Sequence, residues 1–238
     1  MVKNLEFVKV YVWELPVRIF HWINALAILV LSVTGYIIAK PLAIQSSHEA
    51  WNSYWFGTVR AVHFASAYIF LTVMVLRLYW AFFAGNQFAN WKEFIPFRKK
   101  ALQNMGYVLK HDILLIPHKG EKFSQQQLSH ISIGHNSLAT AAYLFLFILA
   151  LVMVFTGFGL YADMATWWLP KMFKWVVPAM GGDFMARSIH HVTMWLMWLI
   201  IAIHIYLVFF HDWLEARGET SSMFSGFKFV CKDRIRKG

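Results

Sequence analysis

The sequence predicts an all-α membrane protein, a four-helix transmembrane bundle with both termini on the cytoplasmic side. The first observation is the composition: 59% of the 238 residues are hydrophobic and 14% are charged, whereas soluble domains carry roughly 25% charged residues. The second is a set of four apolar segments that reach the length of about 20 residues needed to cross a bilayer. They cover residues 20–38, 59–83, 137–161 and 189–210. We expect them to form a single membrane domain over residues 1–238.

The first segment follows a charged leader and lacks a small-residue cleavage pattern. It therefore predicts a retained span rather than a signal peptide. The other three segments are apolar runs of membrane-spanning length. A weaker apolar stretch, residues 167–180, is interrupted by prolines and lysines and predicts an interfacial segment or re-entrant loop instead of a fifth span. The interrupting residues are Pro170, Lys171, Lys174 and Pro178.

The basic residues set the expected orientation, because cytoplasmic loops of membrane proteins are enriched in Lys and Arg. Most of the 22 Lys and Arg residues lie in the leader, in residues 85–136 and in the tail after the fourth segment. We therefore expect both termini in the cytoplasm. These clusters beside the membrane lipids account for the net charge of +10, so we expect no nucleic-acid partner.

Four histidines lie at depths that match in pairs. His21 and His63 lie near the starts of the first and second segments, and His190 and His204 lie 14 residues apart on the fourth. Fourteen helical residues rise roughly 21 Å and return to within about 40° of the same face. With the expected topology, His63 and His190 share the outer side of the membrane, and His21 and His204 share the inner side.

These pairs indicate two b-type haems, an outer one held by His63 and His190 and an inner one held by His21 and His204. Imidazole is a standard axial ligand of haem iron, and ionisable side chains inside a membrane are costly and usually functional. Two nitrogen ligands leave no open position on the iron, so such haems carry electrons. Because Cys231 is the single cysteine, no CxxCH attachment can form and the haems are non-covalent. The alternative is that the histidines are packing residues or relay protons.

Three arginines each precede a proposed ligand by three residues, namely Arg18, Arg60 and Arg187. Residues i and i+3 share a helix face, and guanidinium groups pair well with carboxylates. We therefore expect these arginines to contact haem propionates at the membrane surface. The alternative is that each arginine reaches from a helix end toward water.

The first and third spans end in similar tetrapeptides, VTGY at residues 33–36 and FTGF at residues 155–158. Small residues allow a helix and its neighbour, or a helix and a cofactor, to approach closely. The repeat therefore indicates either a cofactor contact or ordinary helix packing.

Four motifs resemble the b-type cytochrome subunit of membrane-bound nickel–iron hydrogenases. They are RIFHW at residues 18–22, RAVHF at 60–64, GHN at 134–136 and RSIHH at 187–191, and the last continues to Trp195 and His204. The match covers most of the chain. One departure is Ile200 in the fourth span, where the family pattern favours an aromatic residue. The wider superfamily includes formate dehydrogenase gamma subunits and cytochrome b subunits of thiosulfate reductases.

The resemblance implies an electron-transfer subunit of a respiratory uptake hydrogenase in the bacterial inner (cytoplasmic) membrane, not catalytic on its own. Its partners would be the hydrogenase small and large subunits. The small subunit's iron–sulfur cluster would deliver electrons to the outer haem, and the inner haem would pass them to membrane quinone. His135 and Asn136 would lie near that quinone. The alternatives are a solvated loop position for His135 and a helix N-cap for Asn136.

The outside segment, residues 162–186, with Trp167, Trp168, Trp175 and two lysines, is expected to be a docking surface for the hydrogenase or a membrane-surface anchor. Two other functions remain open. One keeps the haems and changes the partner to a formate dehydrogenase or a thiosulfate or polysulfide reductase. The other is a haem-free transporter or membrane anchor whose histidines relay protons.

Overall fold

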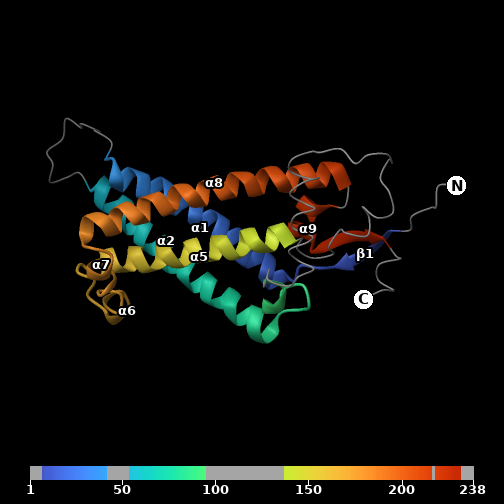
Figure 1. Cartoon of the computed structure of the whole chain (residues 1–238), viewed down its shortest axis with the longest axis horizontal. Coiled ribbons are helices and arrows are strands. Elements are labelled where there is room, and N and C mark those ends of the chain that lie inside the picture. The colour runs from blue at the N-terminus through green and yellow to red at the C-terminus, as the bar shows by residue number, and fades with distance from the viewer. Residues whose placement is uncertain (1–6, 42–53, 95–136, 216–217, 232–238) are drawn as a thin grey trace. The chain divides into compact units, whose positions relative to one another are not determined.

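The computed structural model describes residues 7–41, 54–94, 137–215 and 218–231. Four long helices dominate this part of the chain (Figure 1). They are α1 (Leu15–Ala39), α2 (Trp55–Tyr79), α5 (Ser137–Tyr161) and α8 (Asp183–Glu215). All four are long and apolar enough to cross a membrane. The predicted helical fold class with four spans is confirmed, and the side on which the termini lie stays a prediction.

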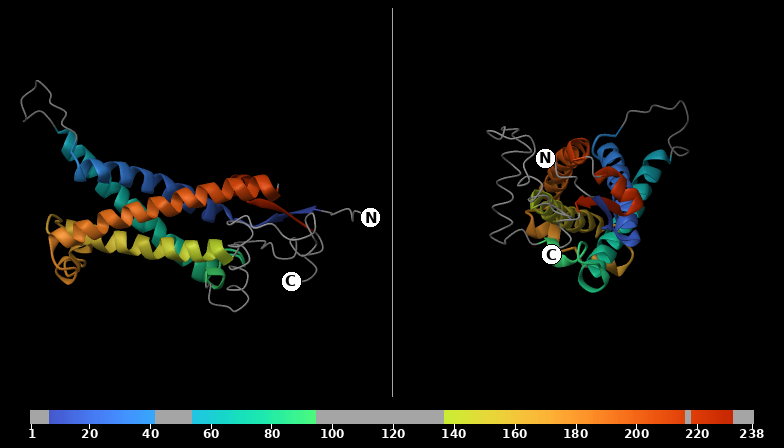
Figure 2. Two further views of the ribbon diagram at one scale, coloured as in Figure 1. Left: turned by 45° about the horizontal axis from the view of Figure 1, so that its top comes forward. Right: turned by 90° about the vertical axis from the view of Figure 1, so that its right-hand side faces the viewer.

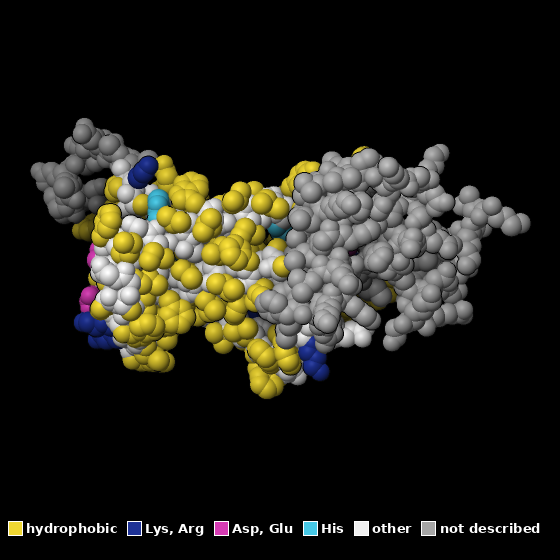
Figure 3. Space-filling model, in the orientation of Figure 1, with side chains coloured by type: hydrophobic (Ala, Val, Ile, Leu, Met, Phe, Trp, Pro, Cys, Tyr) yellow, Lys and Arg dark blue, Asp and Glu magenta, His cyan; other side chains and the backbone are white. Residues whose placement is uncertain are grey.

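The described helices belong to two compact units. One comprises Pro16–Trp80, with nearly all of α1 and the whole of α2, and the other comprises residues 1–15 and 81–238. Many large apolar side chains in both units are exposed, including Leu26, Leu29, Val75 and Leu199. On the face shown in Figure 3, yellow hydrophobic side chains cover the helices and charged side chains lie toward helix ends. Such a surface is expected where lipid tails replace water.

In the smaller unit, α1 begins five residues before the predicted first span and ends one residue after it, and α2 begins four residues before the predicted second span. Pro16 lies in the first turn of α1, where its missing N–H would have no helical partner in any case. The α2 helix continues into a π-helical turn, Trp80–Ala84. Phe20 packs edge-on against Trp80 with ring centroids 6.4 Å apart. This contact joins the start of α1 to the end of α2.

In the larger unit, α5 and α8 run side by side (Figures 1 and 2). Two four-residue helices connect them, α6 (Trp168–Lys171) and α7 (Val176–Ala179). Neither reaches membrane-spanning length, in agreement with the prediction for residues 167–180. A Cβ atom at Gly159 would lie 3.1 Å from the Val176 Cβ and 3.3 Å from the Phe173 carbonyl oxygen. The missing side chain therefore lets the connecting segment pack directly on α5.

A two-stranded antiparallel sheet, which was not predicted, joins β1 (Phe7–Tyr11) to β2 (Phe227–Cys231). A short helix, α9 (Glu219–Ser225), precedes β2. Gly226 between them has a φ of 87°, a conformation that favours glycine. Its carbonyl accepts hydrogen bonds from Val12 and Trp13 at 2.8 and 3.1 Å. These bonds continue the strand pairing to the residues just before α1.

Lys228 is buried in this small substructure, with 5% of its side chain exposed. Its ammonium group lies 2.5 Å from Glu219 Oε2 and 5.3 Å from the centroid of the Trp13 ring. Burial of a charge is costly unless the charge is paired. The Glu219 carboxylate therefore fixes α9 against β2.

We predict that Glu219→Ala destabilises the sheet by about 3 kcal/mol, because the Lys228 ammonium group would be left buried without its carboxylate partner. The measurement is chemical denaturation of the purified chain in detergent. The matched control is Lys9→Ala, since Lys9 lies over the Phe227 ring at 4.2 Å on the exposed face of β1 and should contribute less than about 1 kcal/mol. Equal losses in the two variants would contradict the role of the buried pair.

Candidate functional site

His63 on α2 is held by two consecutive residues near the end of α1. Its Nδ1 atom lies 2.9 Å from the Thr34 hydroxyl oxygen. A Cβ atom added to Gly35 would lie 3.2 Å from His63 Cε1, which is tighter than ordinary van der Waals contact. Gly35 therefore provides the space that the imidazole ring occupies, and Thr34 provides its hydrogen-bond partner.

The same arrangement recurs in the other unit, where His190 on α8 meets the end of α5. His190 Nδ1 lies 2.7 Å from the Thr156 hydroxyl oxygen, and Thr156 is fully buried. A Cβ atom at Gly157 would again lie 3.2 Å from the histidine Cε1. We call each Thr-Gly dipeptide, Thr34-Gly35 and Thr156-Gly157, a Thr–Gly cradle. The repeat seen in the sequence thus marks two histidine-binding positions.

The hydroxyl protons of the cradles are already used within their own helices. Thr34 donates to the Val30 carbonyl at 2.7 Å, and Thr156 donates to the Val152 carbonyl at 2.6 Å. A hydroxyl has one proton to donate and lone pairs that can accept. Each threonine oxygen must therefore accept a hydrogen bond from the Nδ1–H of its histidine. The proton lies on Nδ1, so Nε2 is the ring nitrogen that carries the lone pair.

This form of the imidazole fits haem iron. Metal-binding histidines commonly donate their second ring N–H to a nearby acceptor, which fixes the tautomer and the ring orientation. Both cradles provide this acceptor, so Nε2 is the ring nitrogen whose lone pair suits a metal ion. His63 and His190 therefore have the chemistry of axial ligands.

The other two predicted ligands have different surroundings. His21 lies near the start of α1, with its ring edge-on to Trp22 at a centroid distance of 5.1 Å. His204 lies on an exposed face of α8. In each predicted haem pair, one histidine belongs to each of the two units. The pairing of His63 with His190 and of His21 with His204 stays a prediction.

The three arginines have distinct environments. Arg187 makes a two-point contact with Asp183, with Nε–Oδ2 at 2.6 Å and Nη2–Oδ1 at 3.2 Å. Arg60 lies over Phe64 with its guanidinium carbon 6.0 Å from the ring centroid. Arg18 has a buried Nε. The propionate role of all three stays a prediction. Sequence analysis missed the Asp183 partner, although the i, i+4 spacing on one helix indicates such a pair.

Two further side chains, to which the sequence analysis gave no role, carry buried polar atoms beside predicted ligands. They are Asn24 Oδ1, three residues after His21, and His191 Nε2, next to His190. Neither atom has a hydrogen-bond partner within the described residues. The two predicted quinone residues, His135 and Asn136, lie outside the described residues.

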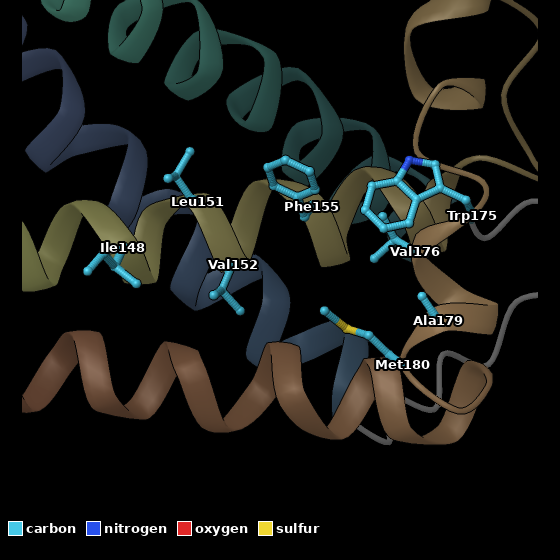
Figure 4. Close-up of a pocket in the computed structure, with 8 residues that line it drawn as sticks. All are labelled: Ile148, Leu151, Val152, Phe155, Trp175, Val176, Ala179 and Met180. Atoms are coloured by element: carbon cyan, nitrogen blue, oxygen red, sulfur yellow. The ribbon is translucent and has the colours of Figure 1, made fainter.

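The segment that connects α5 to α8 exposes aromatic and charged side chains. Trp168 and Trp175 are 65% and 59% exposed, and Lys174 pairs with Asp163 at 2.9 Å. An apolar cavity of about 220 Å³ opens between α5 and the α7 region (Figure 4). Its lining comes from two stretches of chain: Ile148, Leu151, Val152 and Phe155, and then Trp175, Val176, Ala179 and Met180.

The chain is similar along nearly its whole length to proteins named as B-type cytochrome subunits. It is 34% identical over 221 residues to a probable Ni/Fe-hydrogenase B-type cytochrome subunit of Cupriavidus necator, covering 92% of this chain and 86% of the relative. Similarly named proteins of Rhodobacter capsulatus and Escherichia coli are 35% and 32% identical, covering 98% and 95% of this chain and 88% and 93% of the relatives. The profile of the prokaryotic cytochrome b561 family matches residues 12–226. With both cradles inside the matched region, the chain belongs to the prokaryotic cytochrome b561 family.

Proposed function

We propose that this protein is the membrane cytochrome b subunit of a respiratory uptake hydrogenase and transfers electrons from the hydrogenase to membrane quinone. The observation that carries the proposal is the pair of Thr–Gly cradles, which prepare His63 and His190 for iron through Nε2. The names of the relatives, which are Ni/Fe-hydrogenase B-type cytochrome subunits, support the hydrogenase as the partner. On its own the chain is not catalytic.

Two non-covalent b-type haems are the proposed cofactors. His63 and His190 would hold the outer haem, and His21 and His204 would hold the inner one. Each haem, when bound, supplies reversible one-electron transfer at an iron with no open coordination position. Arg18, Arg60 and Arg187 would pair with the propionates, and Arg187 would then exchange or share its present partner Asp183.

The two ends of the helices would serve different partners. The exposed tryptophans of residues 162–186 and the Lys174–Asp163 pair would face the hydrogenase small subunit. His135 and Asn136, on the opposite side of the membrane, would contact quinone. We propose an inner-membrane location with both termini in the cytoplasm and the four spans forming one domain. Hydrogen would then be oxidised outside while protons are taken up inside, making the reaction electrogenic.

The reductant identifies the partner. Membranes that contain the complex are exposed in turn to hydrogen, formate and dithionite while the reduced-minus-oxidised haem spectrum is recorded. Hydrogen should reduce both haems, and added quinone should reoxidise them. Reduction by formate and not by hydrogen would contradict the hydrogenase assignment.

In liposomes, quinone reduction by hydrogen should also generate a membrane potential, and its absence would contradict the proposed orientation of the two sites.

The four histidines should divide into two pairs when haem content is measured. His63→Ala and His190→Ala should each remove the same haem, because each removes one of its two ligands, and His21→Ala and His204→Ala should remove the other. The readout is the haem-to-protein ratio together with the remaining absorption band. His191→Gln, next to a ligand, is the control and should retain both haems. Loss of different haems from His63→Ala and His190→Ala would disprove this pairing.

Valine at either cradle glycine should displace the adjacent imidazole ring. In Gly35→Val and Gly157→Val the Cβ atom alone would lie 3.2 Å from the histidine Cε1, and the added methyl groups require still more space. We expect loss of one haem from each purified variant. Gly57→Val is the matched control, because a Cβ atom there meets nothing within 4 Å. Full haem content in both cradle variants would show that the glycines are not needed to seat the ligands.

A further inference from the structure

We infer that Thr34 and Thr156 are positioning residues for His63 and His190, and that each hydroxyl group lowers the midpoint potential of the haem that its histidine binds by accepting the Nδ1–H bond. The inference rests on the proposed function, because it requires that these histidines bind iron. It goes further by assigning a redox role to two hydroxyl groups that touch no cofactor themselves.

The backbone hydrogen bonds of each threonine hydroxyl indicate that the histidine donates to it. Thr34 donates to the Val30 carbonyl at 2.7 Å and also lies 3.2 Å from the Leu31 carbonyl. Thr156 donates to Val152 at 2.6 Å and lies 3.3 Å from the Met153 carbonyl. With its proton directed at the preceding turn, each hydroxyl presents only lone pairs to the imidazole. The histidine must be the donor in both cases.

Donation to the backbone alone is not distinctive among the described helices. Ser32 donates to the Ile28 carbonyl at 2.7 Å, and Thr72 donates to the Tyr68 carbonyl at 2.8 Å. Neither hydroxyl has a histidine among its hydrogen-bond partners in the described residues. Thr34 and Thr156 differ because a glycine follows each of them and admits an imidazole ring to within reach of the hydroxyl. The same combination occurs in both units, so an incidental contact would have to occur twice.

The redox effect follows from the charge on the iron. Ferric iron withdraws more electron density from a coordinated imidazole than ferrous iron does, so it makes the Nδ1–H a stronger donor. A hydrogen bond to this N–H therefore stabilises the oxidised state more than the reduced state. Removal of the acceptor should raise the midpoint potential. A tenfold change in the preference for ferric over ferrous iron corresponds to about 59 mV for a one-electron couple.

The cradle at Thr34 has a second possible acceptor for its histidine, which affects the expected size of the potential change. The Leu31 carbonyl, 3.2 Å from the Thr34 hydroxyl oxygen, also lies within reach of His63. When the Thr34 hydroxyl is removed, this carbonyl remains as an alternative acceptor. The effect of Thr34→Val should therefore have the same sign as that of Thr156→Val and a smaller size.

The test compares valine and serine variants by potentiometry and by electron paramagnetic resonance of the oxidised complex. Valine keeps the shape of threonine and removes the hydroxyl, whereas serine keeps the hydroxyl and removes the methyl group. Thr156→Val and Thr34→Val should each raise the potential and change the g-values of the haem bound by the adjacent histidine. Thr156→Ser and Thr34→Ser should retain wild-type values. Thr72→Val is the control for loss of a backbone-bonded hydroxyl and should change neither haem.

The haem content, potentials and g-values of the variants either support or overturn the role of the threonine hydroxyl groups. If a valine variant loses its haem while the matching serine variant retains it with a wild-type spectrum, the hydroxyl is again the group required. Wild-type potentials and g-values in Thr156→Val would overturn the inference. So would equal changes in the serine and valine variants, which indicate packing rather than hydrogen bonding. Absence of haem from the wild-type complex would instead overturn the proposed function, and the inference with it.

Discussion

A hydroxyl–imidazole hydrogen bond between two helices is the interaction on which this site depends. In each unit, a threonine near the end of one span accepts the Nδ1–H of a histidine near the start of the next span, at 2.9 Å for His63 and 2.7 Å for His190. An imidazole ring inside a membrane has no water to form hydrogen bonds with its two nitrogens. The threonine satisfies one nitrogen and thereby determines that the lone pair lies on Nε2, the nitrogen proposed to bind iron. The adjacent glycine brings the backbone close enough for the bond to form.

Threonine suits this position because its hydroxyl group can form hydrogen bonds with two helices at once. Its hydroxyl donates to the carbonyl one turn earlier in its own helix and uses its lone pairs for the neighbouring histidine. An acidic side chain at the same place would add a charge within the span, which the bilayer penalises. The cradle therefore fixes the histidine with a neutral acceptor. The same solution in α1–α2 and in α5–α8 explains why the chain repeats a short Thr-Gly motif.

The sequence predicted much of the fold because hydrophobic length is a strong constraint on membrane helices. The third span was predicted with the bounds of α5, and α8 begins six residues before its predicted segment and ends five residues after it. The Thr-Gly repeat was recognised, but its partners were not, since they lie 29 and 34 residues away in the chain. The β1–β2 sheet was missed because its strands are short and far apart in the sequence. His135 and Asn136, chosen by resemblance, remain predictions outside the described residues.

The coordination of the iron is the central claim, and electron paramagnetic resonance of the oxidised wild-type chain tests it most directly. If two histidines bind each iron through Nε2, the spectrum should contain two low-spin ferric signals that together account for two haems per chain. A high-spin signal would mean that an iron lacks a second strong nitrogen ligand. That result, or a single haem per chain, would contradict the assignment of the four histidines as two axial pairs.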